Sequence, residues 1–156
     1  MYLISYGTRP ELIKLFPLIN IFKENNIDHK TIFTGQHEDL IKEFENLTHR
    51  PDFVLEKTMK HKQSINSLIY KIINESQKII NSYDCKVIIQ GDAASSFAVA
   101  LSAFNEGKEV IHVEAGLRTH NLRSPFPEEG FRKMISHISN IHFCPTIKSV
   151  ENLKNE

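Results

Sequence analysis

The feature of this chain that most constrains its fold is the regular alternation of short apolar runs with longer segments of helical periodicity. Each apolar run ends in a glycine or a polar turn, which is typical of a strand that leads into a helix. Several runs are continuously apolar and rich in Val and Ile, as strands covered on both faces require. The predicted strands are Tyr2 to Tyr6, Lys30 to Thr34, Asp52 to Leu55, Lys86 to Gln90, Glu109 to Val113 and Ile141 to Cys144.

The segments between these runs predict helices, because their apolar residues recur at spacings of three and four. The predicted helices are Pro10 to Glu24, Asp39 to Leu47, Ser64 to Ser82, Ala93 to Asn105, Glu128 to Ser139 and Thr146 to Lys154. Since crossovers between parallel strands are right-handed, the repeated strand–helix units predict an α/β fold with a doubly wound, Rossmann-like parallel sheet. At 156 residues the chain has the size of one domain. Such sheets bind ligands at the carboxyl ends of their strands, so the loops that follow the strands carry the candidate site.

Composition excludes some classes of function. The 19 Lys and Arg residues balance the 19 Asp and Glu residues, so the chain lacks the basic surplus of a nucleic-acid-binding protein. No apolar run approaches the roughly 18 residues of a membrane span, and the first residues do not resemble a secretory signal. We therefore expect no nucleic acid or membrane partner and a cytoplasmic location. Cys85 and Cys144 lack the spacing of metal ligands and are expected to be buried free thiols.

The loop after the first predicted strand reads Gly-Thr-Arg-Pro-Glu. Thr8 and Glu11 have the spacing of a capping box and Pro10 suits a first helical turn, so these three residues are interpreted as structural. Arg9 lies where a helix N-terminus faces the strand ends and can add a guanidinium to an anion site. Lys14 falls on the flank of the apolar stripe of the predicted helix Pro10 to Glu24. Its ammonium group must therefore reach out to solvent or pair with a partner. The P-loop and Gly-x-Gly-x-x-Gly patterns are missing, which argues against nucleotide hydrolysis and dinucleotide binding.

Acidic residues occur at three sites after the fourth and fifth predicted strands: Asp92, Glu114, and the pair Glu128 and Glu129 in a loop that leads into a helix. Taken alone, Asp92 is the type of residue that caps the next helix. Glu114 ends a nearly apolar run, where an unpaired carboxylate would be costly to bury, so it needs a partner or a function. Of Glu128 and Glu129, one is expected to complement the helix dipole and the other to point into the cleft. The predicted sheet brings these carboxylates to one rim together with the two cations of the first helix, and such a mixture can separate into an acid and a base.

The histidines favour different interpretations. His112 lies inside a predicted strand and is interpreted as a core histidine, whereas His37 lies in a loop and could be on the surface or face a ligand. No closely spaced pair of ligands such as His-x3-His is present, so we predict no metal site.

Five strand-end loops together carry a resemblance to a known family. They are Gly-Thr-Arg-Pro-Glu (7–11), Thr-Gly-Gln-His (34–37), Gly-Asp (91–92), His-Val-Glu-Ala-Gly-Leu-Arg-Thr (112–119) and Ser-Pro-Phe-Pro-Glu-Glu (124–129). In order and spacing over essentially the entire chain, they resemble the non-hydrolysing UDP-N-acetylglucosamine 2-epimerases. The resemblance implies a GT-B-like architecture of two domains with the active site between them, of which residues 1–156 match the N-terminal, Rossmann-like catalytic domain. The second domain, which holds the uridine, would be absent from this chain, and the full-length protein would be a homodimer.

The resemblance also implies a reaction and its residues. UDP-GlcNAc is converted reversibly into UDP-ManNAc, a precursor of bacterial surface polysaccharides, without a cofactor. The C2 proton is removed, UDP leaves to give a 2-acetamidoglucal, and UDP adds back with C2 protonated from the other face. The catalytic carboxylates of the family match Asp92, Glu114 and Glu128.

Four further positions match binding residues of the family. Arg9 and Lys14 match residues that support the diphosphate and the reacting sugar. Gln36 and His37 match part of an accessory site that binds UDP-GlcNAc and activates the bacterial enzymes.

The chain departs from the family pattern at two places. The usual threonine-rich run after Gly-Asp is Ala93-Ala94-Ser95-Ser96, and the usual Asn before Arg132 is Phe131. Three alternatives therefore stay open: an epimerase of a modified UDP-HexNAc, a GT-B glycosyltransferase, or a nucleotide-sugar-binding domain without turnover. We also expect the 156-residue chain to fold alone without epimerising UDP-GlcNAc, because it lacks the half that would close the cleft.

Overall fold

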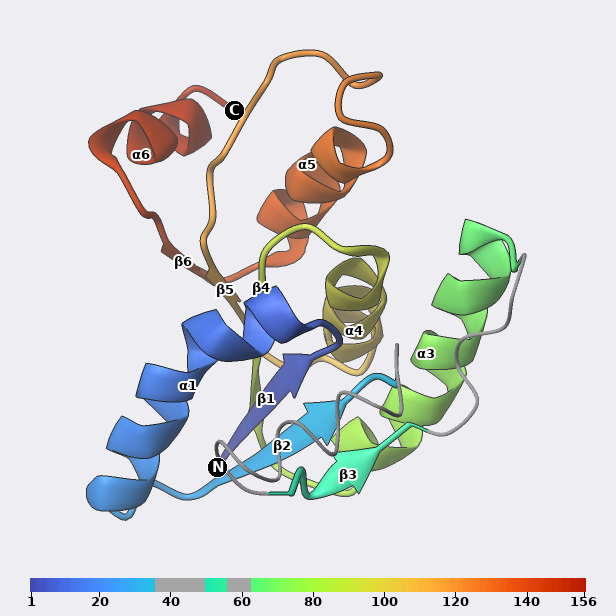
Figure 1. The fold of residues 1–156 in the computed structure, drawn as a ribbon, viewed down its shortest axis with the longest axis vertical. Helices are drawn as coiled ribbons and strands as arrows, with labels where there is room; N and C mark the ends of the chain where they lie inside the picture. Colours follow the sequence, from blue (N-terminus) through green and yellow to red (C-terminus); the bar gives the residue numbers. More distant parts are fainter. Residues whose placement is uncertain (36–49, 56–62) are drawn as a thin grey trace.

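A computed structural model of the chain describes residues 1–35, 50–55 and 63–156. Its described strands form one parallel sheet in the order β3-β2-β1-β4-β5-β6 (Figure 1). The strands are β1 (Tyr2–Tyr6), β2 (His29–Phe33), β3 (Phe53–Val54), β4 (Lys86–Gln90), β5 (Val110–Val113) and β6 (Ile141–Phe143). The order runs outward in both directions from the β1–β4 pair, which is the topological switch point of a doubly wound sheet. The predicted fold class is confirmed.

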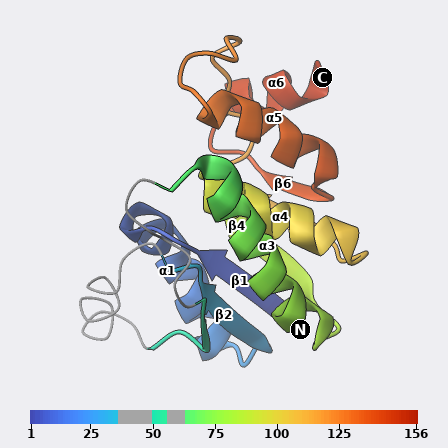
Figure 2. The ribbon, with the colours of Figure 1, turned by 90° about the vertical axis from the view of Figure 1, so that its right-hand side faces the viewer.

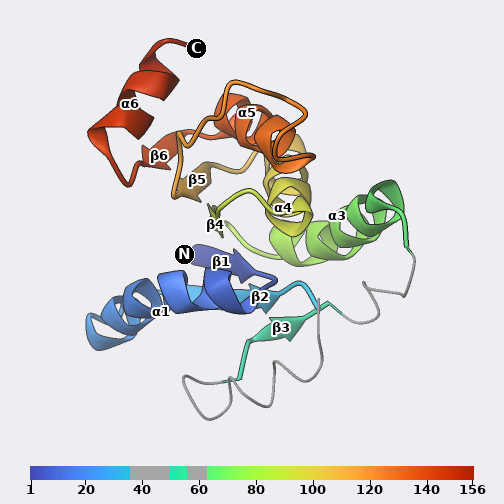
Figure 3. The same ribbon diagram turned by 45° about the horizontal axis from the view of Figure 1, so that its top comes forward.

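Helices cover both faces of this sheet. Helix α1 lies on one side, with α6 beyond the far strands on that same side, and α3, α4 and α5 lie on the other (Figure 3). The termini lie toward opposite ends of the molecule (Figure 2). The helices are α1 (Arg9–Glu24), α3 (Ile65–Asn81), α4 (Ala94–Asn105), α5 (Glu128–Ile138) and α6 (Ile147–Lys154).

Two hydrophobic cores follow from the alternation of side chains along the strands. Leu3 belongs to the core under α3 and α4, whereas its neighbour Ile4 belongs to the core under α1. In α3 the residues at four-residue spacing, Leu68 and Ile72, are buried against the sheet as the sequence pattern predicted. None of the helices in the described part of the chain is long and apolar enough to cross a membrane.

The start of α1 confirms the predicted capping box. The amide of Glu11 donates to Thr8 Oγ1 at 3.4 Å, and the Glu11 carboxylate accepts from the amides of Gly7 and Thr8. Burial raises the pKa of Glu11 even though these bonds favour its charged form. Because Glu11 is used to close this turn, it is unavailable for chemistry at the rim.

The predicted helix Asp39 to Leu47 lies outside the described residues. Both cysteines are free, but only Cys85 is buried, and the prediction of a buried Cys144 is wrong. Cys144 follows the edge strand β6, so it lacks the cover that a central strand provides.

Candidate active site

The site is built around Glu114, the residue directly after β5. Lys14 Nζ lies 2.8 Å from one oxygen of its carboxylate and 2.6 Å from the other. Gln90, the last residue of β4, donates its side-chain amide to the same carboxylate. Glu114 thus has the partner that its place in an apolar run required, and Lys14 meets a carboxylate instead of only snorkelling.

The backbone of Glu114 is unusual for a residue with a side chain. Its φ is 65°, in the left-handed region that costs a non-glycine residue about 1–3 kcal/mol. Gly91, across from it, has a φ of 72°, and a Cβ built on Gly91 would lie 3.9 Å from Glu114 Oε2. The turns after β4 and β5 therefore approach each other closely at the carboxyl edge of the sheet.

Asp92 is held by an arginine and does not cap a helix. Its Oδ2 accepts from Arg132 Nε at 2.7 Å and lies 2.6 Å from a terminal nitrogen of the same guanidinium. The N-cap of α4 is instead Ala93, which makes no side-chain capping bond. The interpretation of Asp92 as a cap is wrong, because two nitrogens of the Arg132 guanidinium contact its Oδ2 and the N-cap position falls to the next residue.

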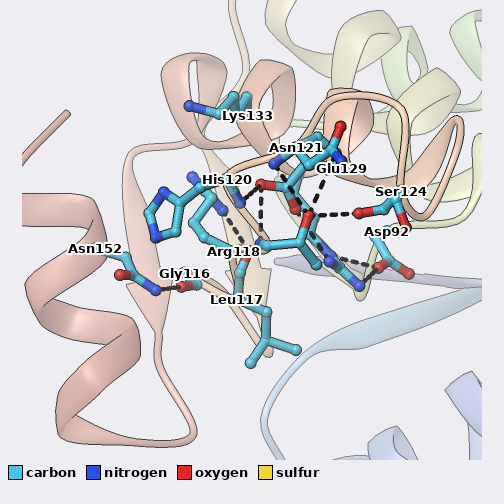
Figure 4. Close-up of polar contacts among 12 residues, drawn as sticks. Asp92, Gly116, Leu117, Arg118, His120, Asn121, Ser124, Glu129, Lys133 and Asn152 are labelled. Carbon is cyan, nitrogen blue, oxygen red and sulfur yellow. Dashed lines mark hydrogen bonds and ion pairs between the residues drawn. The ribbon is translucent and has the colours of Figure 1, made fainter.

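Glu129 is the buried member of the glutamate pair. It accepts from the amides of Thr119 at 3.1 Å and His120 at 3.0 Å, and its other oxygen lies 3.1 Å from a terminal nitrogen of Arg132. Burial opposes the charged form, but these bonds hold the pKa of Glu129 below its ordinary value. Figure 4 shows Asp92 and Glu129 within one network of polar contacts.

Glu128 lies beside this network. It is half-buried and opens α5 together with Glu129. In the described part of the chain its carboxylate makes no hydrogen bond or ion pair. Of the two glutamates, Glu129 is therefore part of the loop structure and Glu128 is the one left for the rim.

His112 lies beneath the turn that carries Asp92. Its side chain is buried, which confirms the prediction of a core histidine. Its Nε2 is 2.8 Å from the carbonyl oxygen of Gly91, and because a carbonyl only accepts, Nε2 carries the hydrogen. Desolvation lowers the pKa of His112 to about 4, so the ring is neutral near pH 7.

Of the four predicted binding residues, two lie in the described part of the chain and two do not. Arg9 is exposed and begins α1 at the carboxyl end of β1. Lys14 is in the site through its pair with Glu114. Gln36 and His37 lie outside the described residues.

The sequence interpretation assigned no role to Gln90 or Arg132, although both hold a candidate carboxylate. The helical spacing does indicate that Arg132 lies near the two glutamates, because it is three residues after Glu129 and one turn after Glu128. No group of three or more His, Cys, Asp or Glu side chains within residues 1–35, 50–55 and 63–156 is arranged to hold a metal ion.

Phe131, which replaces the usual asparagine, does not line the rim. It is 6% exposed and stacks on Phe97 of α4, with ring centroids 5.1 Å apart and 16° between the planes. Phe131 therefore contributes to the packing between α4 and α5.

Comparison with known proteins gives one consistent match. The family described as UDP-N-acetylglucosamine 2-epimerase matches residues 20–156. Proteins of that name are 38% identical in Campylobacter jejuni and 40% identical in Salmonella borreze, each over 99% of this chain. The chain spans 41% of the length of either relative.

Solved structures match in the same way. The crystal structure of the Neisseria meningitidis UDP-GlcNAc 2-epimerase bound to UDP-GlcNAc is 36% identical with a TM-score of 0.92. It covers 99% of this chain, which corresponds to 42% of that protein. The Methanocaldococcus jannaschii enzyme in complex with UDP-GlcNAc and UDP is 35% identical with a TM-score of 0.89, over 99% of this chain and 43% of that one.

Proposed function

Because the chain belongs to the UDP-N-acetylglucosamine 2-epimerase family, we propose that a protein carrying it converts UDP-GlcNAc reversibly into UDP-ManNAc. The observation that carries the proposal is the meeting of Lys14 with Glu114 at the carboxyl edge of the sheet, beside the turn that holds Asp92. Residues 100 positions apart form this pair, so the fold itself assembles a mixed cluster of acids and bases.

The chemistry requires such a cluster. The C2 proton of the sugar is weakly acidic, so its removal needs a placed base, and return of a proton from the opposite face needs a placed acid. Asp92, Glu114 and Glu128 supply these groups in the proposal. Because every group required is a side chain, no cofactor takes part.

Cleavage of the C1–O bond leaves the electron pair on the diphosphate of UDP. Arg9, at the first turn of α1, and Lys14 provide positive charge for this leaving group and for the sugar. UDP then adds back to the 2-acetamidoglucal as C2 is protonated. A second domain, which binds uridine and closes over the rim, completes the proposed enzyme, a cytoplasmic homodimer that supplies surface-polysaccharide synthesis.

The test is an NMR assay of the full-length protein with UDP-GlcNAc in D2O. Deuterium should appear at C2 together with UDP-ManNAc, and Asp92→Asn, Glu114→Gln and Glu128→Gln should each lower this rate by at least about 100-fold. Glu109→Gln is the matched control, because Glu109 precedes the same strand β5 at the opposite edge of the sheet and pairs with Lys86.

Other results would point elsewhere. Transfer of the sugar to an acceptor without solvent deuterium would make the protein a glycosyltransferase. Exchange only with a modified UDP-HexNAc would move the proposal to that substrate, and binding without exchange would leave a non-catalytic domain.

A further inference from the structure

Arg132 connects parts of the site that are distant in the sequence. It lies on α5 with 16% of its side chain exposed, and it contacts Asp92 after β4 and Glu129 on its own helix. One guanidinium therefore serves two carboxylates. No other cation contacts either carboxylate in the part of the chain that the structure describes.

All three nitrogens of the planar Arg132 guanidinium contact a carboxylate. Nε and one terminal nitrogen approach the same oxygen of Asp92, and the other terminal nitrogen approaches Glu129. A lysine ammonium can supply the charge but cannot hold two carboxylates in fixed directions from one rigid plane. The Asp92 carboxylate is thus oriented as well as neutralised.

The connection continues from Glu129 into the loop after β5. The Glu129 oxygen that does not face Arg132 accepts the amides of Thr119 and His120. Thr119 Oγ1 in turn donates to the carbonyl of Ser124 at 2.6 Å. Asp92 is therefore joined through Arg132 and Glu129 to the loop that leads into α5. Figure 4 shows Asp92, Glu129 and Ser124 within this network.

Packing fixes the distance that Arg132 spans. Phe131, the residue before it, stacks on Phe97 of α4, the helix that starts next to Asp92. The start of α4 and the first turns of α5 are thereby held together on their buried side, while Arg132 holds them on the rim side.

We infer that Arg132 is a positioning residue for the proposed reaction: it fixes the Asp92 carboxylate at the rim and ties the turn after β4 to the loop after β5 through Glu129. The inference rests on the proposed function. Without the guanidinium, Asp92 loses its orientation and the buried Glu129 loses its cation. The chemical step should then suffer more than substrate binding, because Arg132 acts through Asp92 and not on the substrate.

The experiment measures kcat and KM of the full-length protein with UDP-GlcNAc for Arg132→Ala, Arg132→Lys and the matched control Lys133→Ala. Lys133 is the next residue and pairs with Glu156, away from Asp92. We expect Arg132→Ala to lower kcat about 100-fold, as displacement of a catalytic group by about 1 Å does, with KM changed less than about 3-fold. Arg132→Lys should recover only a small part of the loss, and Lys133→Ala should retain the parent rate.

Chemical rescue separates positioning from a general loss of structure. Guanidinium chloride at low millimolar concentration should raise the rate of Arg132→Ala several-fold, and sodium chloride at equal ionic strength should not. Equal rescue by both salts, or a parent-like kcat in Arg132→Ala, would overturn the inference while the proposed function stands.

A readout that does not depend on turnover completes the test. The amides of Thr119 and His120 should exchange with solvent at least 10-fold faster in Arg132→Ala than in Lys133→Ala, and unchanged exchange would overturn the inference even if the parent protein has no activity. Absence of activity in the parent protein with accelerated exchange in Arg132→Ala would refute the proposed function and keep the structural link.

Discussion

A change of pH from 7 to 5 should destabilise this chain through His112. The ring is 1% exposed, its Nε2 hydrogen is used by the Gly91 carbonyl, and its Nδ1 has no hydrogen-bond partner in the described structure. A proton added at Nδ1 would place a charge in the core, near His142 and Arg118, which disfavour it, and Asp92, which favours it. The unfolded chain has no such restriction, so it takes up the proton first.

The magnitude follows from the two pKa values. The pKa of His112 is about 4 in the folded chain and 6.5 in the unfolded one. A depressed folded pKa contributes stability that is fully present above pH 6.5, is lost between 6.5 and 4, and stays lost below 4. The free energy of unfolding should fall by about 2 kcal/mol between pH 7 and pH 5, and by about 3 kcal/mol in all.

The assay is urea unfolding of the chain at both pH values, compared with the His112→Gln variant. The glutamine side-chain nitrogen can still donate to Gly91, but it does not titrate. Other groups that titrate, such as Glu11 with its raised pKa and Glu156 with a pKa of about 2, are the same in both proteins and cancel in the difference. The parent should lose about 2 kcal/mol more than the variant over this range.

The reasoning would be refuted by an equal pH dependence in the two proteins. That result would mean that His112 is protonated as easily in the folded chain as in the unfolded one, and hence that its ring is hydrated in solution.

Further changes test other parts of the structure. Gly7→Ala should lower the free energy of unfolding by about 1–3 kcal/mol, because its Cβ would overlap Thr34 Oγ1 at the end of β1. Gly130→Ala, with no heavy atom within 4 Å of the new Cβ in α5, should raise it by up to about 1 kcal/mol, and urea unfolding measures both. Phe131→Asn should cost about 3–5 kcal/mol in the same assay, since the buried stack on Phe97 is lost; an unchanged midpoint would contradict its place in the core. Chelation of divalent ions should leave turnover by the full-length protein unchanged, and a strict metal requirement would reassign the acidic cluster. The isolated chain should unfold cooperatively in a thermal scan yet not turn over UDP-GlcNAc, and turnover by the purified monomeric chain would contradict the two-domain account.

Most of the fold could be predicted because its signals are local. The apolar runs gave the strands to within one or two residues, and Thr8 with Glu11 marked the start of α1. The spacing of Leu68 and Ile72 identified the buried face of α3. Each of these signals lies within a few residues of the element it defines, so one sequence is enough to detect it.

The partners in the site could not be predicted, because they are set by tertiary geometry. Lys14 of the first helix and the loop that carries Glu114 were expected on one rim, but nothing in the sequence states that the two side chains pair. Asp92 shows the limit clearly: its local context favours a helix cap, and Arg132, 40 residues later, outcompetes that use. The choice between Glu128 and Glu129 likewise depends on the amides of a loop that only the folded chain brings near.

The central place of β1 has a consequence for biosynthesis. Its partner β2 ends at Phe33, but its other partner, β4, is complete only at Gln90. A ribosome that adds about 5–20 residues per second needs on the order of 3–10 s to cover that interval. During those seconds the nascent chain presents one unpaired edge of β1 and the apolar side chain of Leu3, so this stretch is where a ribosome-associated chaperone should bind first.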